Sequence, residues 1–182
     1  MLFTALALTL ASLVAATPVD NLAPRAPGHT YTALIHPKAR QDLCIKTASK
    51  YYGGSEALVI GPCAKSLSIP PRFIFTDGKT RVRVEGYNYC LQAGVENGHY
   101  TYSGDGTIAW LGICPPEGTD ATGFEWNFAN GRLEQINTNT GKGRPNQCLD
   151  NTDGANYGIQ MWTCYEGNMN QQWVADEYRA GA

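Results

Sequence analysis

Six cysteines constrain the fold of this chain more than any other feature. They recur as three pairs at a period of roughly 50 residues, namely Cys44 and Cys63, Cys90 and Cys114, and Cys148 and Cys164. The first member of each pair lies in a short apolar stretch, as in Leu43-Cys44-Ile45. An aromatic residue follows each second member about ten residues later, so the pattern indicates three similar structural units.

The repeated sequence context favours pairing of neighbouring cysteines. Six cysteines allow about 15 pairings, and reduced core cysteines or a metal site are the alternatives to disulfides. No Cys-x-x-Cys motif occurs, which argues against zinc. We therefore expect three disulfides and no metal. Each would close a loop within one unit and stabilise the fold by about 3 kcal/mol in the loop-entropy description. The expected bridges are Cys44–Cys63, Cys90–Cys114 and Cys148–Cys164.

The N-terminus has the character of a secretory signal peptide. Residues 2–16 contain only Leu, Phe, Thr, Ala, Ser and Val, and Val14-Ala15-Ala16 offers small residues at a cleavage point. This stretch lacks the usual Lys or Arg near its start, and a buried N-terminal helix is the alternative. Residues 17–29 are rich in proline and read as a linker or a short pro-segment. A secreted, extracellular protein with paired cysteines is the expectation.

Residues 30–176 are predicted to form one domain. The formal net charge is −2, and no block of Lys or Arg is present. This argues against nucleic acid as the main partner. Beyond residues 2–16 there is no long apolar run, so the sequence does not predict insertion into a membrane. Only 16% of the residues are charged, whereas the chain has 20 glycines and 10 tyrosines. A neutral polar and aromatic surface suits neutral ligands such as sugars, although any secreted β protein can show it.

Short β-rich runs bounded by Gly, Asn, Asp and Pro dominate the domain, which predicts an all-β fold. Four strands are expected in each of three repeats, which span about 30–79, 80–130 and 131–176. The strands are expected near 31–36, 43–47, 57–62 and 72–76, then 80–85, 89–93, 107–113 and 124–129, and finally 132–137, 147–150, 159–164 and 171–175. Twelve strands in three groups of four match a β-trefoil. A β-sandwich is the alternative, but it would not explain the threefold period of the cysteines.

The third repeat contains the most specific motif. It reads Gln147-Cys148-Leu149-Asp150, then Gly158 to Cys164 with Trp162, then Asn170-Gln171-Gln172-Trp173. This segment resembles one complete sugar-binding repeat of the ricin B-type lectins, a β-trefoil family marked by Gln-x-Trp. The resemblance covers roughly residues 30–176 and is weaker in the first two repeats. It implies a lectin that binds glycans or polysaccharide and uses no cofactor.

The resemblance also implies a role for each residue of the motif. Asp150 would accept hydrogen bonds from two sugar hydroxyls, and Trp162 would stack on the apolar face of the sugar. Asn170 would bond a ring hydroxyl, and Gln160 would contact the rim. Gln160 and Trp162 alternate on one strand and therefore point to the same face. Gln171 would hold Asp150 or the adjoining turn in place.

The first two repeats depart from this pattern. Lys46 and Gln92 stand at the position of the acid, and Gly61 and Gly112 stand at the position of the platform tryptophan. The motif Asn-Gln-x-Trp is replaced by Arg72 to Phe75 in the first repeat and by Gly123 to Trp126 in the second. Trp110 lies near the platform position but out of register. Both repeats keep the cysteines and an aromatic residue, so we expect scaffold without a sugar site. Trp173 is expected in the core.

No catalytic motif emerges from the sequence. Three histidines, at positions 29, 36 and 99, lie in different segments, and no nucleophile motif surrounds them. A carboxylate pair within the set Asp105, Glu117, Asp120 and Glu125 is a conceivable glycosidase centre, but a solvated loop set is the expectation.

The sequence therefore predicts a secreted, non-catalytic carbohydrate-binding protein with one site, and the resemblance implies galactose or N-acetylgalactosamine glycans as the ligand. A xylan-type ligand, or a trefoil that inhibits a hydrolase through loops such as 49–56 and 94–106, is the alternative. The oligomeric state is not predicted.

Overall fold

The computed structural model describes residues 28–48, 56–63, 71–94, 104–119, 123–136, 146–152 and 158–177. The predicted signal peptide and most of the predicted linker lie outside these residues, as do most of the loops 49–56 and 94–106. In the described part the chain is built from β-strands and one short 3₁₀ turn. No helix among the described residues is long and apolar enough to cross a membrane.

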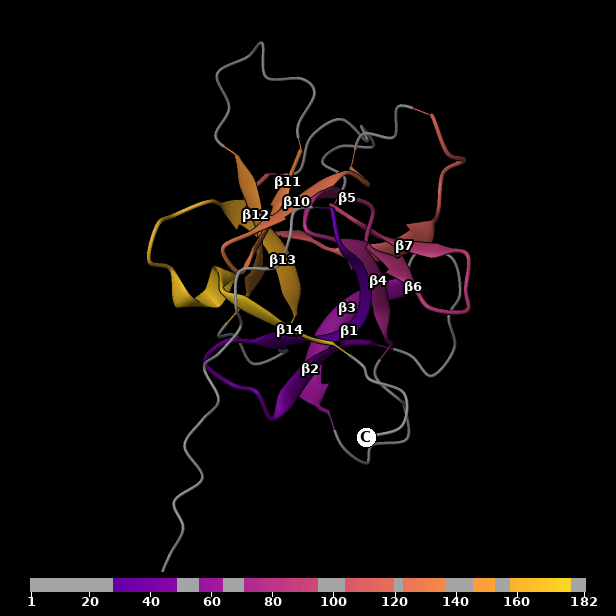
Figure 1. Ribbon diagram of the computed structural model, residues 1–182. Helices are drawn as coiled ribbons and strands as arrows, with labels where there is room; N and C mark the ends of the chain where they lie inside the picture. Colours follow the sequence, from indigo (N-terminus) through magenta and orange to yellow (C-terminus); the bar gives the residue numbers. More distant parts are fainter. Residues whose placement is uncertain are drawn as a thin grey trace, which may run out of the picture.

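The strands follow the predicted threefold grouping (Figure 1). The first repeat holds β1 (Thr30–Pro37), β2 (Leu43–Thr47), β3 (Glu56–Pro62) and β4 (Phe73–Thr76). The second holds β5 (Gly78–Thr80), β6 (Arg83–Val84), β7 (Tyr89–Gln92), β8 (Thr107–Ile108), β9 (Trp110–Ile113) and β10 (Trp126–Ala129). The third holds β11 (Arg132–Gln135), β12 (Gln147–Asn151), β13 (Ile159–Thr163), the 3₁₀ turn η2 (Met169–Gln171) and β14 (Trp173–Glu177). The fold is the predicted β-trefoil.

Two sheets carry these strands. One has the order β14-β1-β4-β6-β7-β9-β3-β2, and the other has the order β5-β10-β11-β12-β13-β8. The first and last strands pair in antiparallel register, with His36 opposite Val174, so the two ends of the domain close on each other. The hairpins β2–β3, β7–β9 and β12–β13 are antiparallel pairs that project around the centre of the molecule (Figure 1).

The three predicted disulfides are present, one in each hairpin. The residue that lies opposite the first cysteine of each hairpin is Gly61, Gly112 or Trp162, so the three hairpins share one register. No free cysteine remains. The covalent threefold organisation read from the sequence is therefore confirmed.

Aromatic side chains from the last strand of each repeat fill the centre. Phe73, Trp126 and Trp173 are almost wholly buried. The indole N–H of Trp126 donates to the carbonyl of Leu91 at 3.0 Å, and that of Trp173 donates to Leu149 at 2.9 Å. These bonds satisfy a buried polar group and tie each core tryptophan to the hairpin of its own repeat. The prediction that Trp173 belongs to the core is confirmed.

The strand register corrects one detail of the first repeat. Phe73 pairs with Val84, as Trp126 pairs with Gln135 and as Trp173 pairs with Pro37 at the closure of the domain. Phe73, the aromatic residue that the spacing from Cys63 predicts, is therefore the counterpart of Trp173. The segment that replaces Asn-Gln-x-Trp ends at Phe73, two residues earlier than expected.

Several strands also differ from the expected ranges, for example β10, which begins at Trp126 and not at residue 124. The strand expected at 107–113 is divided at Ala109, because β8 pairs with β13 of the third repeat whereas β9 pairs with β7. Within the range expected at 80–85, the strand residues are Thr80, at the end of β5, and Arg83–Val84, which form β6. The strand expected at 171–175 begins only at Trp173, because η2 occupies the preceding residues.

Candidate functional site

A buried carboxylate lies at the centre of the third-repeat hairpin. Asp150 on β12 is directly opposite Gln160 on β13, and it is only 4% exposed. The side-chain amide of Gln160 donates to Asp150 Oδ1 at 3.5 Å, and that of Asn168 donates to Oδ2 at 3.3 Å. Burying a charge is costly unless it is hydrogen-bonded. The two amides therefore stabilise the ionised carboxylate and fix its orientation.

Asn168 is a residue that the sequence analysis missed. Its side-chain oxygen accepts from the backbone N–H of Asn170 at 3.0 Å and so caps η2, while its amide nitrogen binds Asp150. An amide can donate and accept at once, and Asn168 uses both functions. Asparagine is a preferred N-cap residue, so an asparagine three residues before Gln171 could have indicated a capped turn at this point.

Trp162 provides an exposed aromatic surface next to this carboxylate. Its side chain is on the same face of β13 as Gln160 and is 37% exposed. Directly opposite it on β12 is Cys148, the first cysteine of the third disulfide. Gly106 approaches from the second repeat, where an added Cβ would lie 3.8 Å from the edge of the indole ring. Glycine at this point leaves room for the ring.

Gln171 holds the turn after the disulfide, which is one of its two expected roles. It is fully buried, and its Oε1 accepts from the backbone N–H of Tyr165 at 2.9 Å. Its Nε2 donates to the carbonyl of Thr163 at 2.9 Å. Asn170 lies half-buried in η2, next to Gln171.

Asp105 connects the second repeat to the third. Its Oδ1 accepts from the backbone N–H of Thr163 at 2.5 Å, from the hydroxyl of Thr163 at 2.9 Å and from the amide of Gln147 at 3.2 Å. Thr163 directly follows Trp162. The sequence predicted that Asp105 belongs to a solvated loop set, but in the structure Asp105 anchors the strand that carries Trp162.

In the first repeat, the positions that correspond to Asp150 and Trp162 are Lys46 and Gly61, and the Lys46 side chain occupies the space at both. Lys46 is 4% exposed, and its aliphatic chain lies over Gly61, where an added Cβ would be 3.3 Å from Lys46 Cδ. The carboxylate is thus replaced by a cation, and the platform is replaced by the stem of that cation.

In the second repeat, the position that corresponds to Trp162 has even less free space. An added Cβ at Gly112 would lie 2.4 Å from Gln92 Oε1 and 3.0 Å from the ring of Phe124. A tryptophan could not occupy this position without displacing both side chains. Trp110 is opposite Gln92 and so matches Gln160, not Trp162. It is out of register with the platform position, as the sequence indicated.

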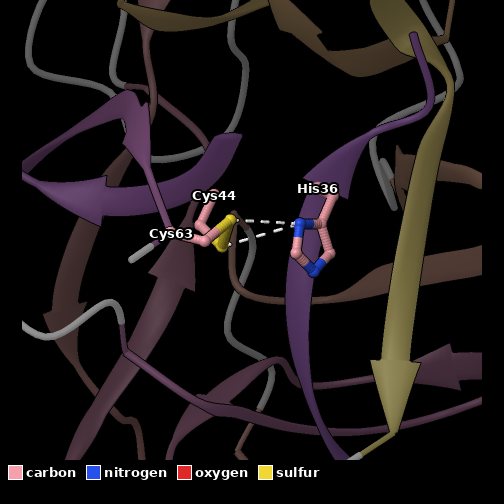
Figure 2. A group of neighbouring side chains, drawn as sticks. All are labelled: His36, Cys44 and Cys63. Carbon is pink, nitrogen blue, oxygen red and sulfur yellow. Dashed lines mark hydrogen bonds between the residues drawn. A yellow bond between two sulfur atoms is a disulfide. The ribbon is translucent and has the colours of Figure 1, made fainter. Parts of the chain in front are cut away.

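One cluster has the composition of a metal site but does not have its chemistry. His36, Cys44 and Cys63 place their nitrogen and sulfur atoms within 4.8 Å of one another (Figure 2). The two sulfurs are bonded to each other as a disulfide, so neither is the thiolate that a metal ion requires. His36 Nδ1 instead lies 3.0 Å from the carbonyl of Leu43, and Nε2 lies 3.1 Å from Asp176 Oδ2.

Fold, disulfides and hairpin register together define a β-trefoil protein. The model of the ricin-type beta-trefoil lectin domain matches residues 31–173, which is most of the chain. The chain therefore belongs to the ricin-type β-trefoil lectin family, and carbohydrate binding is the function of that domain. No curated protein sequence matches the chain.

Solved structures share the fold at low sequence identity. A designed threefold symmetric protein, ThreeFoil, is 13% identical with a TM-score of 0.54, and the match covers 81% of this chain and 99% of that one. The Polyporus squamosus lectin is 15% identical with a TM-score of 0.54, over 84% of this chain and 50% of the lectin. The β-trefoil lectin of the Vibrio vulnificus hemolysin/cytolysin is 14% identical with a TM-score of 0.50, over 84% and 98%.

Proposed function

We propose that this chain is a secreted, non-catalytic lectin with a single sugar site in the third repeat. Asp150 accepts from two neighbouring hydroxyls of the sugar, Trp162 stacks on its C–H face, and Asn170 bonds a further hydroxyl. Gln160 lies at the rim, and Gln171 keeps the turn in place. The predicted signal peptide of residues 1–16 and a lectin domain of residues 30–176 are part of this proposal.

The contrast between the three hairpins supports the proposal best. They share one register and one disulfide position, yet only the third combines a carboxylate with an exposed indole. A core tryptophan would be buried, as Trp126 and Trp173 are. An exposed tryptophan beside an amide-held carboxylate instead supplies both kinds of contact that a sugar needs, because charge-assisted bonds engage the hydroxyls and the indole engages the apolar face.

Galactose or N-acetylgalactosamine is the ligand class that we propose. The family resemblance supports it, because a carboxylate at this position favours the galacto arrangement of hydroxyls. Two structural neighbours are consistent with it. The Polyporus squamosus lectin is described with Neu5Aca2-6Galb1-4GlcNAc bound, and the Vibrio vulnificus lectin with N-acetyl-D-lactosamine bound.

A single surface site that holds one sugar ring gains little free energy after the entropy of association is subtracted. We therefore expect free galactose to bind with a Kd on the order of 0.1–10 mM. Useful affinity must come from clustered glycans on a polymer or a surface.

A glycan array with three proteins tests the function. Wild type should bind galactose-terminated glycans, and Asp150→Asn should lose them. Asp42→Asn is the matched control, because it makes the same chemical change at an exposed carboxylate of the first repeat. Binding of xylan fragments instead of galactosides would reassign the ligand. Absence of all glycan binding, together with tight binding of a hydrolase, would overturn the lectin proposal in favour of an inhibitor.

A further inference from the structure

Each repeat has an equivalent position beside its hairpin disulfide. It is occupied by His36 on β1, Arg83 on β6 and Glu134 on β11. Arg83 pairs with Cys90 as Glu134 pairs with Cys148, and His36 contacts the first disulfide. A second position is also equivalent in the three repeats. There, the backbone carbonyls of Asp42, Asn88 and Asn146 accept from the N–H of the second cysteine of the same repeat, at 3.0, 3.1 and 2.9 Å.

Two of the three repeats fill this position with their own side chains. In the first, the His36 ring packs on the disulfide, with Nδ1 3.3 Å from Cys63 Sγ (Figure 2). In the third, the amide of Asn146 donates to the Glu134 carboxylate, so the two polar groups satisfy each other.

The second repeat leaves the position open. Arg83 and Asn88 are both exposed, and within the described ranges no side-chain hydrogen bond or ion pair joins either to another residue. They line a hollow of about 350 Å³ together with Arg81, Pro115, Pro116 and Glu117, and with the Cys90–Cys114 disulfide. A volume of this size is at the lower end of the range of small-molecule sites.

We propose that this hollow is a second ligand site, which binds a carboxylate-bearing sugar such as a hexuronate. The Arg83 guanidinium matches a carboxylate with two parallel hydrogen bonds. The Asn88 amide can donate to one hydroxyl and accept from another. The rings of Pro115 and Pro116 offer apolar surface to the C–H face of the sugar. That a sugar carries the carboxylate rests on the lectin family, but the site itself does not depend on the third-repeat proposal.

The charges around the hollow favour a singly charged ligand with hydroxyls. Arg81 and Arg83 line the hollow together with Glu117, and Arg81 also lies 3.7 Å from Glu125 Oε1, so Arg83 is the guanidinium of the hollow that no ion pair among the described residues engages. Glu117 repels a compact dianion such as phosphate, yet it can accept from a sugar hydroxyl. The N–H groups of Arg81 already donate to the carbonyls of Pro115, Pro116 and Thr119. Arg81 would therefore attract the ligand through its charge more than through hydrogen bonds.

The larger neighbouring hollow, of about 690 Å³, is a weaker candidate. It is lined by Lys79, Arg81 and Glu125, among others. Lys79 Nζ already lies 2.8 Å from Glu125 Oε2, and Arg81 lies 3.7 Å from Oε1 of the same carboxylate. Its cations are therefore compensated within the protein, whereas Arg83 is not.

The test uses the full chain carrying Asp150→Asn, so that the third-repeat site is disabled. Galacturonate and galactose are titrated while the side-chain NMR signals of Arg83 and Asn88 are followed. Galacturonate should shift both signals with a millimolar Kd, and galactose should not. Adding Arg83→Gln should weaken galacturonate binding about tenfold or more, and Arg83→Lys should weaken it less. Arg132→Gln removes the same charge elsewhere and should leave the Kd unchanged.

Equal weakening by Arg132→Gln and Arg83→Gln would overturn the site, because only net charge would then matter. Binding of acetate or inorganic phosphate as strong as that of galacturonate would overturn its assignment to a sugar. Loss of all galacturonate binding in Asp150→Asn would place the ligand in the third repeat instead. If galactose failed to bind wild type while galacturonate still shifted Arg83, the third-repeat proposal would fail and this one would stand.

Discussion

Replacing Asp150 with asparagine separates sugar recognition from stability more cleanly than any other single change. Asparagine keeps the shape of the side chain and one acceptor oxygen, but it turns the other oxygen into an amide donor. Two amide donors face this side chain, from Gln160 and from Asn168. Asn168 cannot rotate its amide without losing the cap on Asn170, because its oxygen is already used there. Gln160 has no such constraint and can turn its oxygen toward the new donor.

This geometry sets a small cost for stability. With the Gln160 amide rotated, the asparagine oxygen faces Asn168 and its amide faces Gln160, so no buried donor is left without a partner. The loss is then the difference between charged and neutral hydrogen bonds, about 1 kcal/mol. For a domain of this size that corresponds to a drop in Tm of about 2–4 °C.

The cost for sugar binding is larger. A hydrogen bond to a charged group contributes about 1.5–3 kcal/mol, so galactose affinity should fall roughly ten- to a hundredfold. Calorimetric titration with galactose and thermal unfolding, both beside Asp42→Asn, measure the two effects on the same protein. Unchanged galactose affinity in Asp150→Asn would refute the carboxylate's role. A fall in Tm far beyond the expected range would refute the hydrogen-bond rearrangement on which the small stability cost depends.

Four further outcomes follow from the structure. Trp162→Ala should weaken galactose binding at least as much as Asp150→Asn in the same titration, and wild-type affinity would exclude the indole as platform. Trp173→Ala should lower the free energy of unfolding by about 3–5 kcal/mol, measured by urea denaturation, with Trp126→Ala similar, because both indoles are buried and hydrogen-bonded. Galactose should titrate with one site per chain, and two or three equivalent sites would mean that Lys46 and Phe124 do not block the other hairpins. The Arg40 guanidinium bonds Asp42 and holds the pKa of that carboxyl below its usual value, so Arg40→Gln should raise the pKa measured by NMR, and an unchanged pKa would contradict this.

The sequence predicted the parts of the fold that depend on local pattern and on covalent links. Disulfide pairing could be read because each pair recurs in the same apolar context, and the hairpins share one register in the structure. The ends of strands were less predictable where neighbouring residues pair with different partner strands. Ala109 divides one expected strand because its neighbours pair with different repeats, and no local propensity encodes that change. The alignment of Arg72–Phe75 with Asn-Gln-x-Trp is wrong by two residues, since pairing with β6 makes Phe73 equivalent to Trp173, as the spacing from Cys63 predicts.

The candidate site could be predicted only as far as its motif extends. Asp150, Gln160 and Trp162 follow from spacing on a hairpin, because directly paired and alternate residues share a face. Asn168 and Asp105 lie outside the motif. Asn168 contacts Asp150 because η2 brings it back to β12, and Asp105 reaches Thr163 across the boundary between repeats. Contacts of this kind depend on tertiary packing, which a single sequence does not display.

Because the core and the hairpin faces are separate, the proposed sugar site can be confined to the third hairpin without a change in the fold. Phe73, Trp126 and Trp173 support the centre of the trefoil, and each disulfide closes its own hairpin, whatever stands on the hairpin's outer face. Glycine at the position that corresponds to Trp162 therefore leaves no open space in the first two repeats, because Lys46 or Phe124 covers it. Glycine at Gly112 even allows Phe124 to pack closely. The residues on each hairpin face can thus differ between repeats while the cysteines and core aromatics remain.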